Sequence, residues 1–214
     1  MLLHGLGDSY HFSFSLCILG ESGTGKSQLV SCTLPEPPQV AESGDSIADH
    51  GIRTRAHTYE SRGARYQILM WEVPGAPRYQ GVAARYASMA AGLIIVFDRS
   101  RRATFDRVPL WLKAVEGSSP GLPMVLVGNK SDLTEEVSSA EAGLLAQQLG
   151  CEYFETCATK NQMVPEAFST VIAKVVAQIP NPPEPSLLLK KRVQIGKQLV
   201  ENKAFRAALF DMAS

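Results

Sequence analysis

The eight residues 20–27 read Gly-Glu-Ser-Gly-Thr-Gly-Lys-Ser and come directly after an apolar run at residues 12–19. A glycine-rich turn between a buried strand and a helix points backbone N–H groups at an anion, and the helix dipole favours negative charge there. In this spacing the lysine reaches phosphate oxygens and the final hydroxyl is suited to Mg²⁺. The motif therefore predicts a nucleoside triphosphate site, with Lys26 on the phosphates and Ser27 on the metal.

A second motif stands where the apolar run at residues 125–128 ends, in the order Asn129, Lys130, Ser131 and Asp132. A carboxylate in this place can accept the N1–H and the exocyclic amino protons of guanine, which adenine does not offer. We expect Asp132 to select guanine, Lys130 to lie over the base, and Asn129 to tie this loop to the phosphate loop. An adenine-specific enzyme is disfavoured by Asp132.

Together the two motifs resemble those of the Ras superfamily of small GTPases, and within it the divergent Rab-like branch. The resemblance covers residues 12–179 and includes Trp71-Glu-Val-Pro-Gly75 and Glu155-Thr-Cys-Ala-Thr159. It implies GTP or GDP and Mg²⁺ as cofactors, with the backbone N–H of Ala158 on the guanine carbonyl. The nucleotide-binding residues that it implies are Gly20, Ser22, Gly23, Thr24, Gly25, Lys26, Ser27, Gly75, Asn129, Lys130, Asp132, Cys157 and Ala158.

Three positions depart from the pattern of that family near the terminal phosphate. Ala76 stands where the family has the glutamine that orients the attacking water, so no catalytic residue is assigned and intrinsic hydrolysis is expected to be slow. Glu72 replaces the aspartate that holds the metal through a water, and it is one methylene longer. Asp49 aligns with the switch threonine that binds Mg²⁺; a carboxylate there could bind the metal but would repel the γ-phosphate.

The alignment at Asp49 depends on the register through the proline-rich residues 35–38. Thr54 and Thr58 are the alternatives for the switch threonine, but both lie in an alternating stretch that is typical of a hairpin strand. No aromatic residue occurs between Gly20 and Ala56, so the ring that packs against guanine in the family has no candidate there.

Strands and helices alternate along the chain, which favours an α/β fold. We expect the P-loop GTPase (Ras-like) fold: a six-stranded, mostly parallel sheet flanked by helices, with a C-terminal helical tail. One helix is expected over residues 104–115, and another is opened by a capping pair of Ser138 and Glu141. The expected divisions are an N-terminal extension at 1–11, a Ras-like domain at 12–179, a proline-rich linker at 180–185 and the tail at 186–214.

Composition is that of an ordinary globular chain: 214 residues, 45% hydrophobic, 20% charged and a net charge of zero, so nothing points to nucleic acid as a partner. Four cysteines without metal-binding spacing fit reduced thiols in the cytoplasm. No apolar run reaches the length of a membrane span, and no signal peptide is recognisable.

Beyond residue 186 the tail mixes apolar residues with an excess of Lys and Arg. This composition fits a helix that docks on a protein, a helix on a membrane surface, or a disordered segment. No cysteine follows Cys157, so we expect no prenyl anchor of the kind that Rab proteins use. We therefore expect protein partners at the switch regions and at the tail.

Two classes of function fit these residues. The first is an atypical Rab-like GTP-binding protein with weak hydrolysis that acts as a switch or module in a protein assembly. The second is a catalytically dead pseudo-GTPase scaffold subunit, which Ala76, Asp49 and Glu72 favour. The altered switches and the missing lipid site resemble the Rab-like GTPases of intraflagellar transport, which implies a cytoplasmic or ciliary location.

Overall fold

The computed structural model describes residues 10, 12–33, 51–61, 63–117 and 121–179, and the backbone of 193–195. Asp49, the linker at 180–185 and most of the N-terminal extension and of the tail lie outside the described residues. Within them, no helix is both long and apolar enough to cross a membrane.

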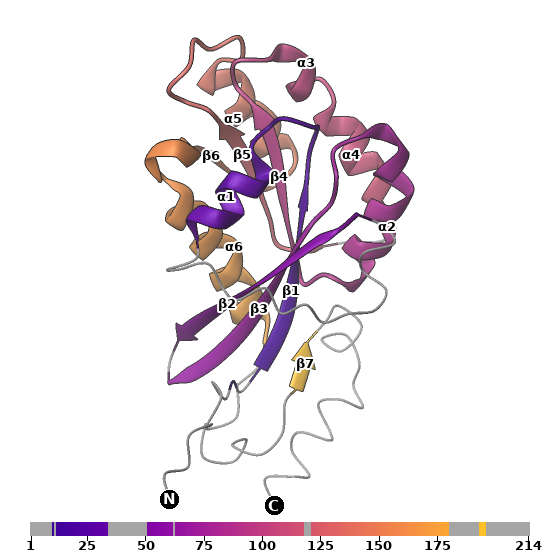
Figure 1. Ribbon diagram of the computed structural model, residues 1–214, viewed down its shortest axis with the longest axis vertical. Helices are drawn as coiled ribbons and strands as arrows, with labels where there is room; N and C mark the ends of the chain where they lie inside the picture. Colours follow the sequence, from indigo (N-terminus) through magenta and orange to yellow (C-terminus); the bar gives the residue numbers. More distant parts are fainter. Residues whose placement is uncertain are drawn as a thin grey trace, which may run out of the picture.

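Six strands form the main sheet in the order β2-β3-β1-β4-β5-β6, and β2 alone runs antiparallel to its neighbour (Figure 1). The predicted six-stranded, mostly parallel sheet is confirmed. All residues of the central strands β1 and β4 are buried, and most of them are apolar, as expected of strands that are covered on both faces. The strands are β1 (Phe12–Leu19), β2 (Arg53–Ser61), β3 (Ala64–Glu72), β4 (Gly92–Asp98), β5 (Met124–Asn129) and β6 (Glu152–Glu155).

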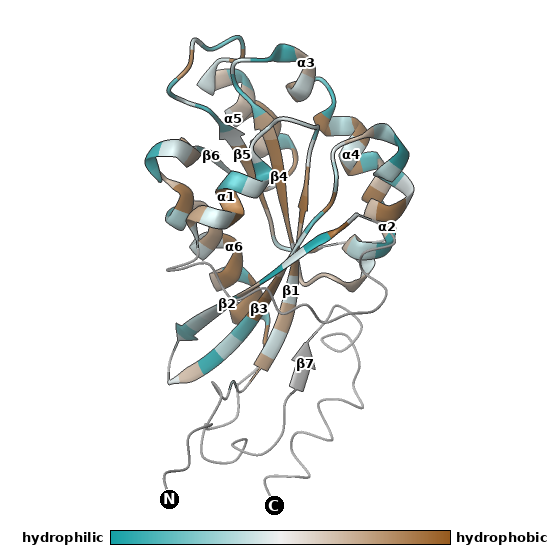
Figure 2. Ribbon diagram, viewed as in Figure 1, coloured by the Kyte–Doolittle hydropathy of each residue, from teal (hydrophilic) through white to brown (hydrophobic). Residues whose placement is uncertain are grey.

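Helices cover both faces of this sheet. Alternate residues of β1 enter two separate cores, with Phe14 and Leu16 in the core under α1 and α6, and Cys17 and Leu19 in the core under α2, α4 and α5. Figure 2 shows the apolar strands between helices whose outer sides are hydrophilic. The helices are α1 (Lys26–Cys32), α2 (Gln80–Met89), α3 (Arg102–Phe105), α4 (Val108–Val115), α5 (Ser139–Gln148) and α6 (Val164–Gln178), with 3₁₀ turns η2 (Pro77–Tyr79) and η3 (Ala158–Lys160).

The single helix predicted over residues 104–115 is wrong in its continuity, because α3 and α4 are separate. Pro109 has no N–H to donate to the carbonyl of Phe105, so the first helix ends at Phe105. Pro109 is tolerated in the first turn of α4, which begins at Val108. The capping pair is confirmed: Ser138 precedes α5, and its hydroxyl accepts from the backbone N–H of Glu141 at 3.3 Å.

Part of the tail forms a strand where the sequence predicts a helix. Residues Val193–Ile195 form β7, which pairs in parallel with Phe12–Phe14 of β1. This edge of β1 is available because β4 begins to pair only at Leu16. The helical prediction is therefore wrong for these three residues, and for the rest of the tail it stays a prediction.

Candidate nucleotide-binding site

The phosphate loop joins the carboxyl end of β1 to α1 and is held from two sides. Gly25 has a φ of +92°, and a Cβ there would lie 2.3 Å from Nδ2 of Asn129. From the other side Gly75 lies so close that its Cβ would be 2.2 Å from the backbone N of Ser22. Both positions require glycine, because a side chain would push the loop away from its neighbours.

Lys26 is buried at the start of α1 with its ammonium group turned back over the loop. Its Nζ donates to the carbonyl oxygens of Gly20 and Glu21, each at 2.8 Å. Burial lowers the pKa of Lys26 to about 8, although Glu72 and Glu21 act in the opposite direction. A bound phosphate would favour the charged form, so this lysine suits an anionic ligand.

Two of the three residues predicted for the metal, Ser27 and Glu72, come together at the end of β3, and the third, Asp49, lies outside the described residues. The Ser27 hydroxyl donates to Oε1 of Glu72 at 2.5 Å, and Oε2 of Glu72 is buried without a partner among the described residues. A hydroxyl and an unsatisfied carboxylate oxygen fit Mg²⁺, which is bound by few protein oxygens together with phosphate and water. The described residues contain no group of three or more His, Cys, Asp and Glu that could hold a metal alone.

A cavity of ≈ 540 Å³ lies beside the loop, and Lys26, Ser27, Arg53, Glu72 and Gly75 are among its lining residues. A larger cavity of ≈ 930 Å³ lies near the amino ends of the strands, and none of the predicted site residues lines it. The smaller cavity is the one that fits the phosphates, because in open α/β sheets ligands bind at the carboxyl ends of the strands.

Asn129 joins the base-side loops to the phosphate loop, as the sequence predicts. Its Nδ2 donates to the carbonyl oxygen of Thr24 at 2.9 Å. Its Oδ1 accepts from the hydroxyl of Thr156 at 3.1 Å and from the backbone N–H of Ala158 at 3.2 Å. One buried amide thus fixes three loops that are distant in the sequence.

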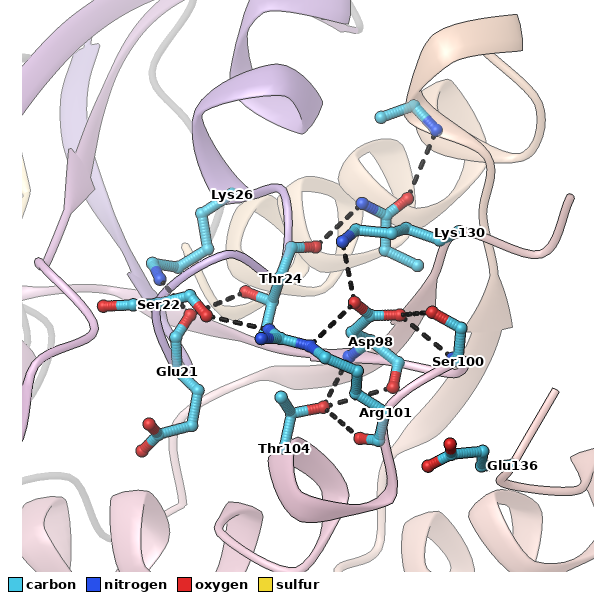
Figure 3. Close-up of polar contacts among 12 residues, drawn as sticks. Glu21, Ser22, Thr24, Lys26, Asp98, Ser100, Arg101, Thr104, Lys130 and Glu136 are labelled. Carbon is cyan, nitrogen blue, oxygen red and sulfur yellow. Dashed lines mark hydrogen bonds and ion pairs between the residues drawn. The ribbon is translucent and has the colours of Figure 1, made fainter. Parts of the chain in front are cut away.

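Asp98, at the end of β4, is a site residue that the sequence reasoning missed. Its buried carboxylate receives Lys130 Nζ at 2.7 Å and Arg101 Nε at 3.1 Å, and Ser100 donates to it as well (Figure 3). Arg101 continues to the phosphate loop, where it donates to the carbonyl oxygen of Ser22 at 2.9 Å. A charged residue ending an otherwise apolar strand was the available signal.

The remaining base-side residues surround the same edge of the sheet. Asp132 is exposed, and its carboxylate has no hydrogen bond or ion pair with a described residue. Cys157 is buried and exchanges backbone hydrogen bonds with Gln162. The N–H of Ala158, which the resemblance assigns to guanine, is directed at Asn129 instead. The roles of these residues toward a base stay predictions.

On the phosphate side, Ala76 follows Gly75 and precedes η2, and its methyl group offers no hydrogen bond. Thr54 and Thr58 are residues of β2. They alternate with Arg53, which reaches Ser27, so both threonines point to the opposite face of the sheet. In this register neither threonine lies on the face of β2 that meets Ser27, and the assignment of Asp49 stays a prediction.

Comparison with known proteins agrees with the fold. A family model described as the Ras family matches residues 15–177. The chain is 32% identical to the Ras-related protein Rab-25 of Oryctolagus cuniculus over 91% of this chain and 93% of the relative. It is 32% identical to the Ras-related protein RABA1b of Arabidopsis thaliana, over 78% and 77%. It is 28% identical to the Ras-related protein Rab11C of Lotus japonicus, over 81% and 80%.

The phosphate loop at the carboxyl end of β1 in a mostly parallel sheet defines a P-loop protein that binds a nucleoside phosphate. The chain belongs to the Ras family and is a Rab-like small GTPase. Members of this family bind GTP and GDP with Mg²⁺, and Rab-like GTPases contact other proteins through their switch regions.

Proposed function

We propose that this protein binds GTP and GDP with Mg²⁺ and acts as a switch or module in a protein assembly, with weak intrinsic hydrolysis. The observation that carries the proposal is the amide of Asn129, which joins the phosphate loop at Thr24 to the loop of Ala158. Its hydrogen bonds hold the phosphate side and the base side of the site in one arrangement. Such preorganisation lowers the cost of ordering a site around its ligand.

In this proposal Lys26 binds the β- and γ-phosphates, and Ser27 and Glu72 hold the metal, Glu72 through a water. Lys130 is the residue that covers the base. Its ammonium group is anchored by Asp98, which leaves the aliphatic stem to lie against the face of a purine. Asp132 is exposed and unpaired among the described residues, so its carboxylate is free to accept from guanine.

A pseudo-GTPase scaffold is the second candidate, and Ala76 is the observation that favours it. A methyl group cannot hold a water in line with the γ-phosphate, so hydrolysis would need a group from a partner protein. In the scaffold case the nucleotide would be absent, permanent or structural. The intact phosphate loop and Asp132 favour nucleotide binding in both cases, and the two candidates differ in turnover.

We place the protein in the cytoplasm, because its four cysteines are free, which fits a reducing compartment. Its partners would contact the switch regions and the tail. The pairing of β7 with β1 is one way in which residues of the tail can dock, as a strand added to a sheet edge.

Titration of GDP and ADP into nucleotide-free protein tests the guanine proposal. We expect GDP to bind at least about a hundredfold more tightly, because a site that hydrogen-bonds a ligand strongly rejects an analogue without the matching groups. Asp132→Ala should remove this preference, and Glu166→Ala, an exposed acid on α6, should leave it unchanged. Equal binding of the two nucleotides by the unmodified protein would show that the guanine assignment is wrong.

A further inference from the structure

Arg53, the first residue of β2, lies at the metal side of the phosphate cavity. It pairs across the hairpin with Glu72, the last residue of β3, and its NH1 lies 3.2 Å from Oγ of Ser27. Arg53 also lines the cavity of ≈ 540 Å³ that Lys26 and Ser27 line. The guanidinium forms no ion pair with a carboxylate of the described residues. Among the described residues, a cation without a carboxylate partner therefore lies next to the hydroxyl that would ligate Mg²⁺.

The charges around this cavity give Arg53 a distinct role. Among the lining residues the charged side chains are Lys26, Arg53 and Glu72. The charge of Lys26 is offset by Glu72, so Arg53 supplies the net positive charge of the lining. A guanidinium presents several N–H donors in a planar fork that matches phosphate oxygens. The cavity therefore fits a polyanion, and the positive charge of Arg53 is part of its lining.

We propose that Arg53 is a phosphate-binding residue of this site, which contacts the terminal phosphate of the bound nucleotide and takes over part of the charge neutralisation that Mg²⁺ provides. The inference deepens the proposed function and rests on it. Its consequence is that nucleotide binding falls less on removal of Mg²⁺ than it would with a neutral side chain at this position.

Arg55 provides a matched control within the same strand. It lies on the same face of β2, two residues further on, and its NH1 donates to Oγ of Ser31 at 2.7 Å, one helical turn beyond Ser27. Arg55 does not line the phosphate cavity. Substitution of either arginine removes one charge and one hydrogen bond to a serine of α1, so a difference between them reports on the cavity itself.

The experiment is a calorimetric titration of nucleotide-free full-length protein with GDP, in excess Mg²⁺ and in EDTA, for the unmodified protein, Arg53→Gln, Arg53→Lys and Arg55→Gln. Loss of a charge-assisted contact should weaken GDP binding by Arg53→Gln about tenfold in EDTA. The loss should be smaller in Mg²⁺, and it should shrink at high salt because Arg53 is exposed. Arg53→Lys should retain part of the affinity, and Arg55→Gln should match the unmodified protein.

Equal binding by Arg53→Gln and Arg55→Gln in EDTA would overturn the role of Arg53 while leaving the guanine site intact. A parallel titration with inorganic tripolyphosphate separates the two proposals, since this probe has no base. An Arg53-dependent affinity for tripolyphosphate supports the phosphate role even if guanine and adenine nucleotides bind alike. Absence of binding to any of these ligands in Mg²⁺ overturns both.

Discussion

At the scale of single residues, the buried carboxylate of Asp98 connects the base side of the site to the phosphate side. It holds Lys130, which belongs to the base loop, and Arg101, which reaches the phosphate loop at Ser22. Burial acts to raise the pKa of Asp98, but hydrogen bonds from Lys130 and Ser100 outweigh it and bring the pKa below its ordinary value of 3.8. The ionised form is therefore the one that the fold stabilises.

Asp98→Asn should lower the free energy of unfolding by about 2 kcal/mol at neutral pH, because two cations lose their charged acceptor. A group with a depressed folded pKa stabilises above its unfolded pKa and loses that contribution as pH falls through the folded pKa. The difference in free energy of unfolding between the unmodified protein and Asp98→Asn should therefore shrink as pH falls below 3.8. Urea denaturation at several pH values would measure it.

Asp106→Asn is the control for this substitution, since Asp106 pairs with Arg102 at the surface and its side chain is 57% exposed. We expect Asp106→Asn to lower the free energy of unfolding by less than about 0.5 kcal/mol. If the free energies of unfolding of the unmodified protein and of Asp98→Asn differed by the same amount down to acidic pH, the role assigned to the carboxylate would be wrong.

Because Ala76 stands in place of the glutamine that orients the attacking water, we expect slow GTP hydrolysis. Single-turnover GTP hydrolysis by the isolated protein should be no faster than the slow Ras-type intrinsic rate of about 10⁻⁴ s⁻¹. Ala76→Gln should raise the rate severalfold without restoring it fully, because on the proposed alignment Glu72 and Asp49 would still alter the metal site. Ala103→Gln, on α3, should have no effect. Turnover within a minute by the unmodified protein would mean that another residue positions the water.

At the scale of elements, the phosphate loop depends on a close approach between Gly25 and the side chain of Asn129. In Gly25→Ala the new Cβ would lie 2.3 Å from Nδ2 of Asn129 on a backbone with φ of +92°. We expect GDP binding to weaken at least tenfold. The strained φ of alanine and the loss of the hydrogen bond from Asn129 to Thr24 each cost on the order of 1–3 kcal/mol. Calorimetric titration of GDP measures the loss.

Gly81→Ala is the matched control, because a Cβ at that position of α2 would meet no atom of the described residues within 4 Å outside its own helix backbone. Alanine in a helix should leave GDP binding unchanged and raise stability by up to about 1 kcal/mol. Similar losses of GDP affinity in Gly25→Ala and Gly81→Ala would contradict the role assigned to the close contact between Gly25 and Asn129.

The type and order of most elements could be predicted from the sequence, because buried strands and capped helices are local patterns. The apolar runs at β1, β4 and β5 and the Ser138 cap of α5 are examples. The break between α3 and α4 required weighing Pro109 against an otherwise helical pattern. The strand β7 could not be predicted, since it depends on an edge of β1 that only the assembled sheet defines.

At the scale of the whole molecule, the site lies at the carboxyl ends of the strands, whereas β7 pairs with the opposite end of β1. Deletion of residues 186–214 removes β7 and should therefore leave GDP affinity unchanged, as calorimetric titration would show. The first residues of β1 lose a neighbouring strand, so we expect a lower melting temperature. A tenfold loss of GDP affinity would mean that the tail supports the site.

The same scale decides how much of the site the sequence could predict. Residues within the two motifs were identifiable, because their spacing alone carries the chemistry, and the structure brings the phosphate loop and Asn129 together. Asp98 and Arg53 were not, because each acquires its role from a partner far along the chain: Lys130 for one and Ser27 for the other. Such pairings follow from the sheet order.

Identification of the nucleotide that copurifies with the protein tests the central claim most directly. The full-length chain would be purified in Mg²⁺, denatured to release bound small molecules, and the supernatant resolved by chromatography against guanine and adenine nucleotide standards. The proposed function predicts GDP or GTP near one equivalent per chain, and Lys26→Ala should remove it. Recovery of adenine nucleotide in that amount would contradict the account.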